Sequence, residues 1–189
     1  MEYINIIVVL TIALGIYIFF DLLLHPKKPL KKRLIFYLFL SYMVVLLDSY
    51  FLVIHIPPVG VEWMDPQLKP FRFLEMIIYF LNYTSIEVAQ FVIKYVCMIA
   101  FNFIPLGIFL GWYFNVMRWS KVLVLSVSIA FIMGCVRHLL SCLGFVAIGV
   151  FDVDYIILQS IGSLVGYGVY RLGRKIRRSL SERRTRLKG

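Results

Sequence analysis

Residues 151–171 read FDVDYIILQSIGSLVGYGVYR, and this stretch carries most of the features that decide the fold. Two carboxylates, Asp152 and Asp154, stand at the start of an apolar segment. Within that segment Gly162 and Gly166 lie four residues apart, a spacing of small residues that lets membrane helices pack closely. A basic tail follows at once. The pattern predicts a tightly packed transmembrane helix with a hydrated outer entrance and a cytoplasmic tail.

The composition is typical of a membrane protein. The chain has 189 residues, of which 61% are hydrophobic and 16% are charged, and its mean hydropathy is +0.88. Soluble domains carry about a quarter charged residues, and several apolar runs here approach the roughly 20 residues that cross a bilayer core. We therefore predict an all-α fold, a polytopic membrane helix bundle.

Five transmembrane helices are predicted, with the N-terminus outside and the C-terminus inside. They form a single bundle over residues 1–170, followed by a basic cytoplasmic tail over 171–189, and their approximate spans are 4–24, 34–54, 88–113, 122–145 and 155–170. Of the 20 lysines and arginines, the three predicted inner segments hold 5, 2 and 9. This orientation follows the positive-inside rule.

Residues 71–83 are too short to cross a bilayer but rich in aromatic side chains. Prolines at positions 57, 58, 66 and 70 make the preceding stretch a loop. The segment is predicted either to lie in the outer interface or to form a re-entrant piece packed on the bundle.

Polar residues within the predicted spans gather in the outer halves. At about 1.5 Å per residue, Asp48 and Arg137 each lie roughly 5 Å outward of their helix midpoints, and Lys94 about 9 Å outward. Because an unpaired charge in hydrocarbon is costly, we predict an Asp48–Arg137 ion pair beside a hydrated, outward-facing binding pocket. Its predicted lining is Asp48, Arg72, Gln90, Lys94, Arg137, His138, Asp152 and Asp154. In the alternative, Lys94 reaches outward to the interface, Arg137 pairs locally and no pocket exists.

Small residues and proline mark the predicted helix-packing positions. Gly162 and Gly166 allow close approach of a neighbour, either within one chain or between two chains. Pro105 is predicted to kink the third span, and Gly107 beside it to admit another helix.

Recognisable catalytic and metal-binding patterns are missing from the sequence. The three cysteines lie in apolar runs without metal-ligand spacing, and no nucleophile elbow, zinc-protease motif or phosphate loop is present. We therefore expect no metal and no cofactor, assign no catalytic residue, and favour a non-enzymatic role while leaving an enzyme open.

Three motifs resemble the VanZ-like family of small bacterial membrane proteins. The first is Leu68-Lys69-Pro70-Phe71, and the second is Phe103-Ile104-Pro105-Leu106-Gly107. The third is the acidic stretch Asp152-Val153-Asp154-Tyr155, followed by Gln159-Ser160-Ile161-Gly162. Together they cover about residues 66–170 in the order and approximate spacing of the family.

The chain departs from the family pattern at several polar positions. Arg137 and Leu140 lie near the places of the family's Glu-x-x-Gln, and Tyr155 replaces the last acid of the acidic stretch. The family's Asn is Gln159, and the polar residue of the third span has moved to Asn102. An activity that needs those carboxylates would be lost or altered in this member.

The resemblance implies a multi-pass protein of the bacterial plasma membrane, linked to antibiotic resistance of the teicoplanin type. We expect it to engage membrane lipids and either a lipidated glycopeptide or a lipid-linked cell-wall precursor, with no nucleic-acid partner and with oligomers possible. Two alternatives stay open. One is a membrane-embedded enzyme that acts on a lipid-linked substrate and uses Asp152 or Asp154 as base or metal ligand, with His138 carrying the proton. The other is a structural partner of another membrane complex.

We predict that Asp48→Ala destabilises or mislocalises the protein, because the substitution leaves the cation of the Asp48–Arg137 pair uncompensated within the membrane. Expression level and membrane localisation measure the effect. Normal expression and activity of the variant would remove the ion pair from the hypothesis.

Overall fold

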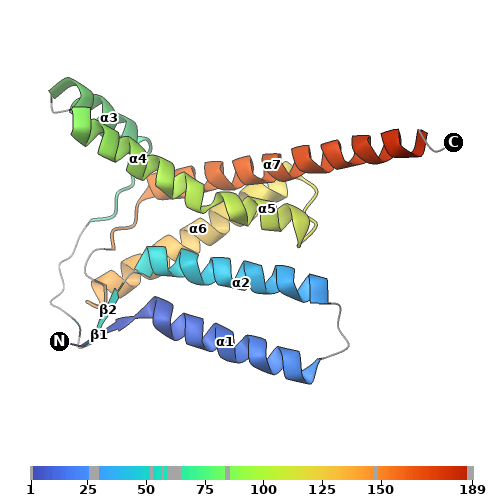
Figure 1. Ribbon diagram of the computed structural model, residues 1–189. Coiled ribbons are helices and arrows are strands. Elements are labelled where there is room, and N and C mark those ends of the chain that lie inside the picture. Colours follow the sequence, from blue (N-terminus) through green and yellow to red (C-terminus); the bar gives the residue numbers. More distant parts are fainter. Residues whose placement is uncertain are drawn as a thin grey trace. The chain divides into compact units, whose positions relative to one another are not determined.

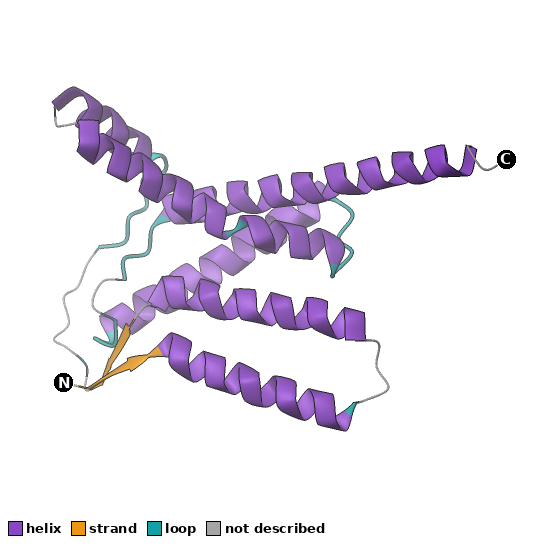
Figure 2. Cartoon of the chain, viewed as in Figure 1, coloured by secondary structure: helices purple, strands orange, loops and turns teal. Residues whose placement is uncertain are grey.

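The computed structural model describes residues 2–25, 30–51, 53–56, 58, 65–83, 86–146 and 149–186. Helices dominate these residues (Figure 2). Their bounds are α1 Ile6–Leu24, α2 Leu30–Phe51, α3 Arg72–Tyr83, α4 Ile86–Asn102, α5 Ile104–Trp112, α6 Trp119–Cys142 and α7 Val153–Arg186 (Figure 1). The predicted all-α class is confirmed. A short antiparallel pair, β1 Glu2–Asn5 with β2 Val53–Ile56, was not predicted.

Four helical stretches of the described chain are long and apolar enough to cross a membrane. They are Ile7–Leu24, Arg33–Phe51, Ile86–Trp112 and Trp119–Cys142, and they correspond to the first four predicted spans. The predicted fifth span lies in α7, which is not among the four. Polar and small residues such as Asp154 and Gln159 lower the hydropathy of its first half, and its second half is strongly basic. The fifth crossing stays a prediction.

The chain folds into two compact units. One comprises Met1–Leu68 and Phe131–Val153, and the other comprises Lys69–Ala130 and Asp154–Gly189. Helix α6 contributes its first half to the second unit and its second half to the first. The prediction of a single bundle over residues 1–170 stays a prediction.

In the first unit, an ion pair joins the adjacent ends of α1 and α2. Arg33, with 6% of its side chain exposed, lies 3.0 Å from the Asp21 carboxylate through Nη2 and donates through Nε to the same group at 3.0 Å. The Tyr37 hydroxyl donates to that carboxylate at 2.6 Å, and Arg33 Nη1 donates to the His25 carbonyl at 2.9 Å. An acid near a helix C-terminus and a base near an N-terminus each oppose the helix dipole, so their mutual pairing stabilises this hairpin.

In the second unit, α7 packs its small residues directly against the backbones of α4 and α5. A methyl group added at Gly162 would overlap the carbonyl oxygen of Ala100, and one added at Gly166 would overlap that of Ile104. From the other side, a methyl group at Gly107 would overlap the carbonyl oxygen of Ser163. All three glycines therefore lie against backbone of the same chain, and a contact between two chains stays a prediction.

Pro105 marks the break between α4 and α5. Helix α4 ends at Asn102, and α5 begins at Ile104 with Pro105 in its first turn and the buried Phe103 between them. Proline cannot donate a backbone hydrogen bond and displaces the preceding turn. A new helix, α5, begins there, and its Gly107 lies against the backbone of α7 at Ser163.

Two further contacts hold α7 against the first half of α6. The buried Ser126 hydroxyl donates to the Ser163 hydroxyl at 2.6 Å. The rings of Trp119 and Tyr167 meet edge to face, with centroids 4.8 Å apart, a favourable aromatic geometry. Beyond Tyr167 the helix continues to Arg186, so the predicted basic tail is helical over most of its length.

We predict that Gly162→Ala lowers the free energy of unfolding by about 1–3 kcal/mol, because the added methyl group forces two backbones apart. The matched control is Gly173→Ala on the same helix, where an added methyl group meets nothing within 4 Å. The control is expected to be neutral or slightly stabilising, since alanine favours helix over glycine. Thermal unfolding of both variants in detergent measures the difference. Equal thermal stability of the Gly162→Ala and Gly173→Ala variants would contradict the close packing of α7 against α4.

Candidate functional site

The carboxylate of Asp154 binds the first turn of α3. Its Oδ1 accepts a hydrogen bond from the backbone N–H of Phe71 at 2.6 Å, and its Oδ2 accepts one from Phe73 at 2.9 Å. Only 4% of Asp154 is exposed. The first N–H groups of a helix have no partner inside the helix, and a negative charge there also favours the helix dipole. An acid at the start of α7 therefore caps a helix some eighty residues earlier.

In the first unit, the chain just before α3 is tied to the chain just before α7. Gln67 donates its backbone N–H to the Phe151 carbonyl at 2.8 Å and accepts from Val153 N–H at 3.1 Å. These two bonds form a parallel bridge between Gln67 and Asp152. The Leu-x-Pro-Phe motif, which begins at Leu68, thus comes immediately after the residue that pairs with Asp152 of the acidic motif.

Helix α3 carries its apolar side chains on the surface. None of its residues is buried, and it runs beside α4 (Figure 1). Its exposed large apolar and aromatic side chains are Leu74, Met76, Ile78, Tyr79, Leu81 and Tyr83. At about 1.5 Å per residue, 12 residues extend only about 18 Å, too short to cross a bilayer. The interfacial and re-entrant placements both stay predictions.

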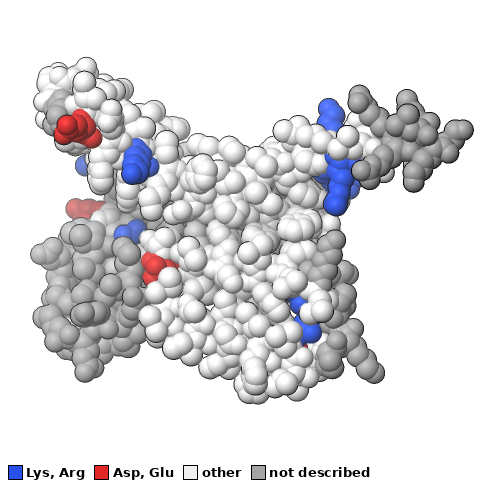
Figure 3. All heavy atoms as spheres, in the orientation of Figure 1, with Lys and Arg blue, Asp and Glu red and all other residues white. Residues whose placement is uncertain are grey.

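Apart from the buried Asp154, the described charged groups on and just before α3 and α4 are exposed. Lys69 Nζ lies 2.7 Å from the Glu75 carboxylate at the start of α3. Arg72, Gln90 and Lys94 are exposed. The face in Figure 3 is accordingly mostly uncharged among the described atoms.

Tyr155, which replaces an acid of the family pattern, joins α7 to α4. Its hydroxyl lies 2.6 Å from the hydroxyl of Tyr95, and the two rings are 6.5 Å apart. A neutral hydrogen bond between helices thus occupies the place where the family has a carboxylate.

In the first unit, α6 positions Arg137 and His138. The Arg137 guanidinium lies 6.0 Å from the centre of the buried Tyr50 ring, a cation–π distance. His138 Nδ1 lies 3.1 Å from the Gly149 carbonyl oxygen. Because a carbonyl oxygen only accepts hydrogen bonds, this contact places a proton on Nδ1 and leaves Nε2, 3.8 Å from Cys142 Sγ, as the basic nitrogen.

The predicted pocket residues are divided between the two units. Asp48, Arg137, His138 and Asp152 lie in the first unit, all half-buried, and Arg72, Gln90, Lys94 and Asp154 lie in the second. The Asp48–Arg137 pair and the pocket as a whole stay predictions. Among the described residues, no group of three or more His, Cys, Asp or Glu is placed to hold a metal ion.

Comparison with known families settles the relationship of the chain. A model of the VanZ/LLP1 family matches residues 33–174, from the start of α2 into the basic part of α7. The chain belongs to the VanZ/LLP1 family. The resemblance inferred from the three motifs is thereby confirmed. No curated protein matches the chain, and no solved structure matches it.

Sequence reasoning missed the capping role of Asp154 in this VanZ-family chain. One signal was available: the residues immediately before α3, Leu68 to Phe71, include none of the Ser, Thr, Asp or Asn side chains that cap helices locally. A helix without a local cap requires an acceptor from elsewhere. The Asp21–Arg33 pair was also missed, because both residues were assigned to the boundaries of predicted spans.

We predict that Asp154→Ala loosens the start of α3 and lowers stability by at least about 1 kcal/mol, the typical effect of losing a helix cap. Amide hydrogen exchange should rise over residues 71–75 while the middle of α7 stays protected. Glu87→Ala, which removes an exposed carboxylate from the first turn of α4, is the control. Unchanged exchange at residues 71–75 would show that the cap is dispensable.

Proposed function

We propose that this VanZ-family protein is a non-enzymatic protein of the bacterial plasma membrane that engages an amphiphile at its outer face. The amphiphile is a lipidated glycopeptide or a lipid-linked cell-wall component, and binding contributes to resistance of the teicoplanin type. The proposal combines the family relationship with the surface presented by α3 and the neighbouring part of α4.

The observation that carries the proposal is an apolar helix held at one end and exposed along its length. Asp154 holds the N-terminal turn of α3 through two hydrogen bonds, while Ile78, Tyr79 and Tyr83 remain exposed. A surface helix with exposed aromatic and aliphatic residues suits the interface between water and lipid. It also offers a preformed apolar surface to the acyl chain of an amphiphile, with less ordering cost than a mobile segment.

Two cations belong to the same pair of helices. Arg72 lies in the first turn of α3, and Lys94 lies on α4 of the same unit, where it is exposed. An amphiphile with an anionic or polar head and an acyl chain has the matching distribution of charge and apolar surface. Arg137 would meet anionic groups only if the predicted pocket forms.

The two alternative functions receive less support from the contacts. An enzyme that used Asp154 as its base would have to withdraw the carboxylate from both backbone N–H groups of α3. Docking to another membrane protein through the glycines of α7 would compete with α4 and α5, which already cover Gly162 and Gly166. A test for catalysis would therefore substitute Asp152 and His138.

The test is binding of teicoplanin and of the same glycopeptide core without its acyl chain to purified protein in detergent micelles. The lipidated compound should bind, the acyl-free core should not, and the double variant Ile78→Ala, Tyr79→Ala should weaken binding about tenfold. The control is Ile176→Ala, Leu180→Ala, which removes exposed apolar side chains from the basic half of α7. Equal binding of both compounds, or an unaffected α3 variant, would contradict the proposal.

A lipid-linked wall precursor is tested in the same protein by native mass spectrometry. A binder should retain the intact precursor and release no product. If the wild type released a product and Asp152→Ala kept the ligand but lost that release, the protein would be an enzyme instead.

A further inference from the structure

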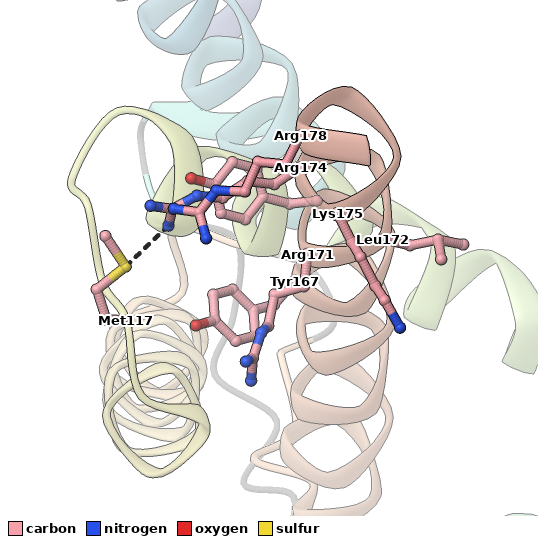
Figure 4. A pocket seen from close by; sticks show the side chains of 8 residues that line it. Met117, Tyr167, Arg171, Leu172, Arg174, Lys175 and Arg178 are labelled. Atoms are coloured by element: carbon pink, nitrogen blue, oxygen red, sulfur yellow. Dashed lines mark hydrogen bonds between the residues drawn. The ribbon is translucent and has the colours of Figure 1, made fainter. Parts of the chain in front are cut away.

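A cavity of about 470 Å³ lies beside α7, in the second unit, where the apolar half of the helix passes into the basic half (Figure 4). Four cations of α7 line it: Arg171, Arg174, Lys175 and Arg178. Its other described lining residues are aromatic, aliphatic or sulfur-containing, and no carboxylate is among them. None of these residues belongs to the predicted outer pocket.

The four cations form one stripe of the helix. Their spacing of three, four and seven residues places them on the same face, and like charges at such spacing destabilise a helix. Among the described residues that line the cavity, none is an acid that would offset this repulsion, although Glu182 lies four residues beyond Arg178 on the same helix. An anion bound within the cavity would offset it.

Two of the guanidinium groups are positioned by weak partners. Arg171 lies 5.7 Å from the centre of the Trp119 ring, and Arg174 Nη1 lies 3.1 Å from the Met117 sulfur (Figure 4). An aromatic face takes no N–H group in a strong hydrogen bond, and a thioether is a weak acceptor. The guanidinium groups are therefore oriented while most of their donors stay available for a stronger acceptor.

Phosphate is the anion that matches these donors. Arginine side chains bind phosphate oxygens through paired, charge-assisted hydrogen bonds, and the cavity is large enough for a phosphate with attached groups.

The apolar part of the lining indicates that the phosphate belongs to a lipid. Tyr167, 1% exposed, and Tyr170 border the cavity, and Leu172 beside it is exposed. Tyr and Trp are enriched where a membrane protein meets the headgroups, and Trp119 lies against Tyr167 here. A headgroup phosphate next to acyl chains fits such a boundary between basic and apolar surface.

We propose that this cavity binds the phosphate of an anionic phospholipid headgroup, on the side of the membrane that the positive-inside rule predicts to be cytoplasmic. The site is specific: cations that line the cavity bind the lipid, and cations elsewhere on α7 do not. Binding there holds the basic half of α7 at the membrane surface.

The experiment compares single variants of equal charge in purified full-length protein. Arg174→Gln and Arg178→Gln remove cations from the cavity, and Arg177→Gln removes an exposed cation of the same helix that does not line it. Nanodiscs containing phosphatidylglycerol and phosphatidylcholine supply the lipids, and native mass spectrometry counts the lipids retained. Thermal unfolding in neutral detergent identifies any variant that fails to fold, and the other cavity variant then carries the comparison.

The wild type and Arg177→Gln should retain phosphatidylglycerol in preference to phosphatidylcholine, and each cavity variant should lose about five- to tenfold in retention. Equal losses in all three variants would show diffuse attraction by the whole basic helix and overturn the specific site. Inorganic phosphate serves as the second probe. If it displaced the lipid at millimolar concentration and bound alone with the same dependence on Arg174, the site would belong to free phosphate rather than to a headgroup.

Discussion

Direct contact between helix backbones is the constraint on which the second unit depends. Lipid tails are as apolar as leucine side chains, so apolarity alone gives membrane helices no reason to associate. Association then depends on van der Waals contact and on hydrogen bonds between helices. Glycines at 162 and 166 bring α7 against the carbonyl groups of α4 and α5, and the Ser126–Ser163 hydrogen bond adds a polar contact. Beyond the break at Pro105, Gly107 of α5 adds a further close contact with the backbone of α7.

The position of α7 in turn decides what its two ends can do. At its start, Asp154 reaches the first turn of α3 and replaces a cap that the local sequence does not provide. In its second half, Arg171 lies beside the ring of Trp119 and Arg174 beside the sulfur of Met117. One packed helix thus supports both the apolar surface of α3 and the basic cavity.

The first unit depends on a different kind of contact. Asp21 and Arg33 are separated by a turn, and each would weaken its own helix if left alone, since each opposes the dipole of that helix end. Paired and joined by Tyr37, they hold α1 and α2 together. Arg137 similarly lies against an aromatic ring, that of Tyr50. Charges in this protein are therefore accommodated by aromatic groups as well as by opposite charges.

The sequence by itself determined the membrane class, the approximate bounds of α1 to α6 and the family, because long apolar runs, prolines and short motifs are local signals. Tertiary structure alone decided the partners of the polar groups. From the sequence, Asp154 is predicted to line a binding pocket, and in the structure both its carboxylate oxygens accept hydrogen bonds from backbone N–H groups at the start of α3. The sequence leaves the partner of Gly162 open, and the structure supplies Ala100. Such choices depend on which residues far apart in the chain come within hydrogen-bond distance, and helical periodicity carries no information about that.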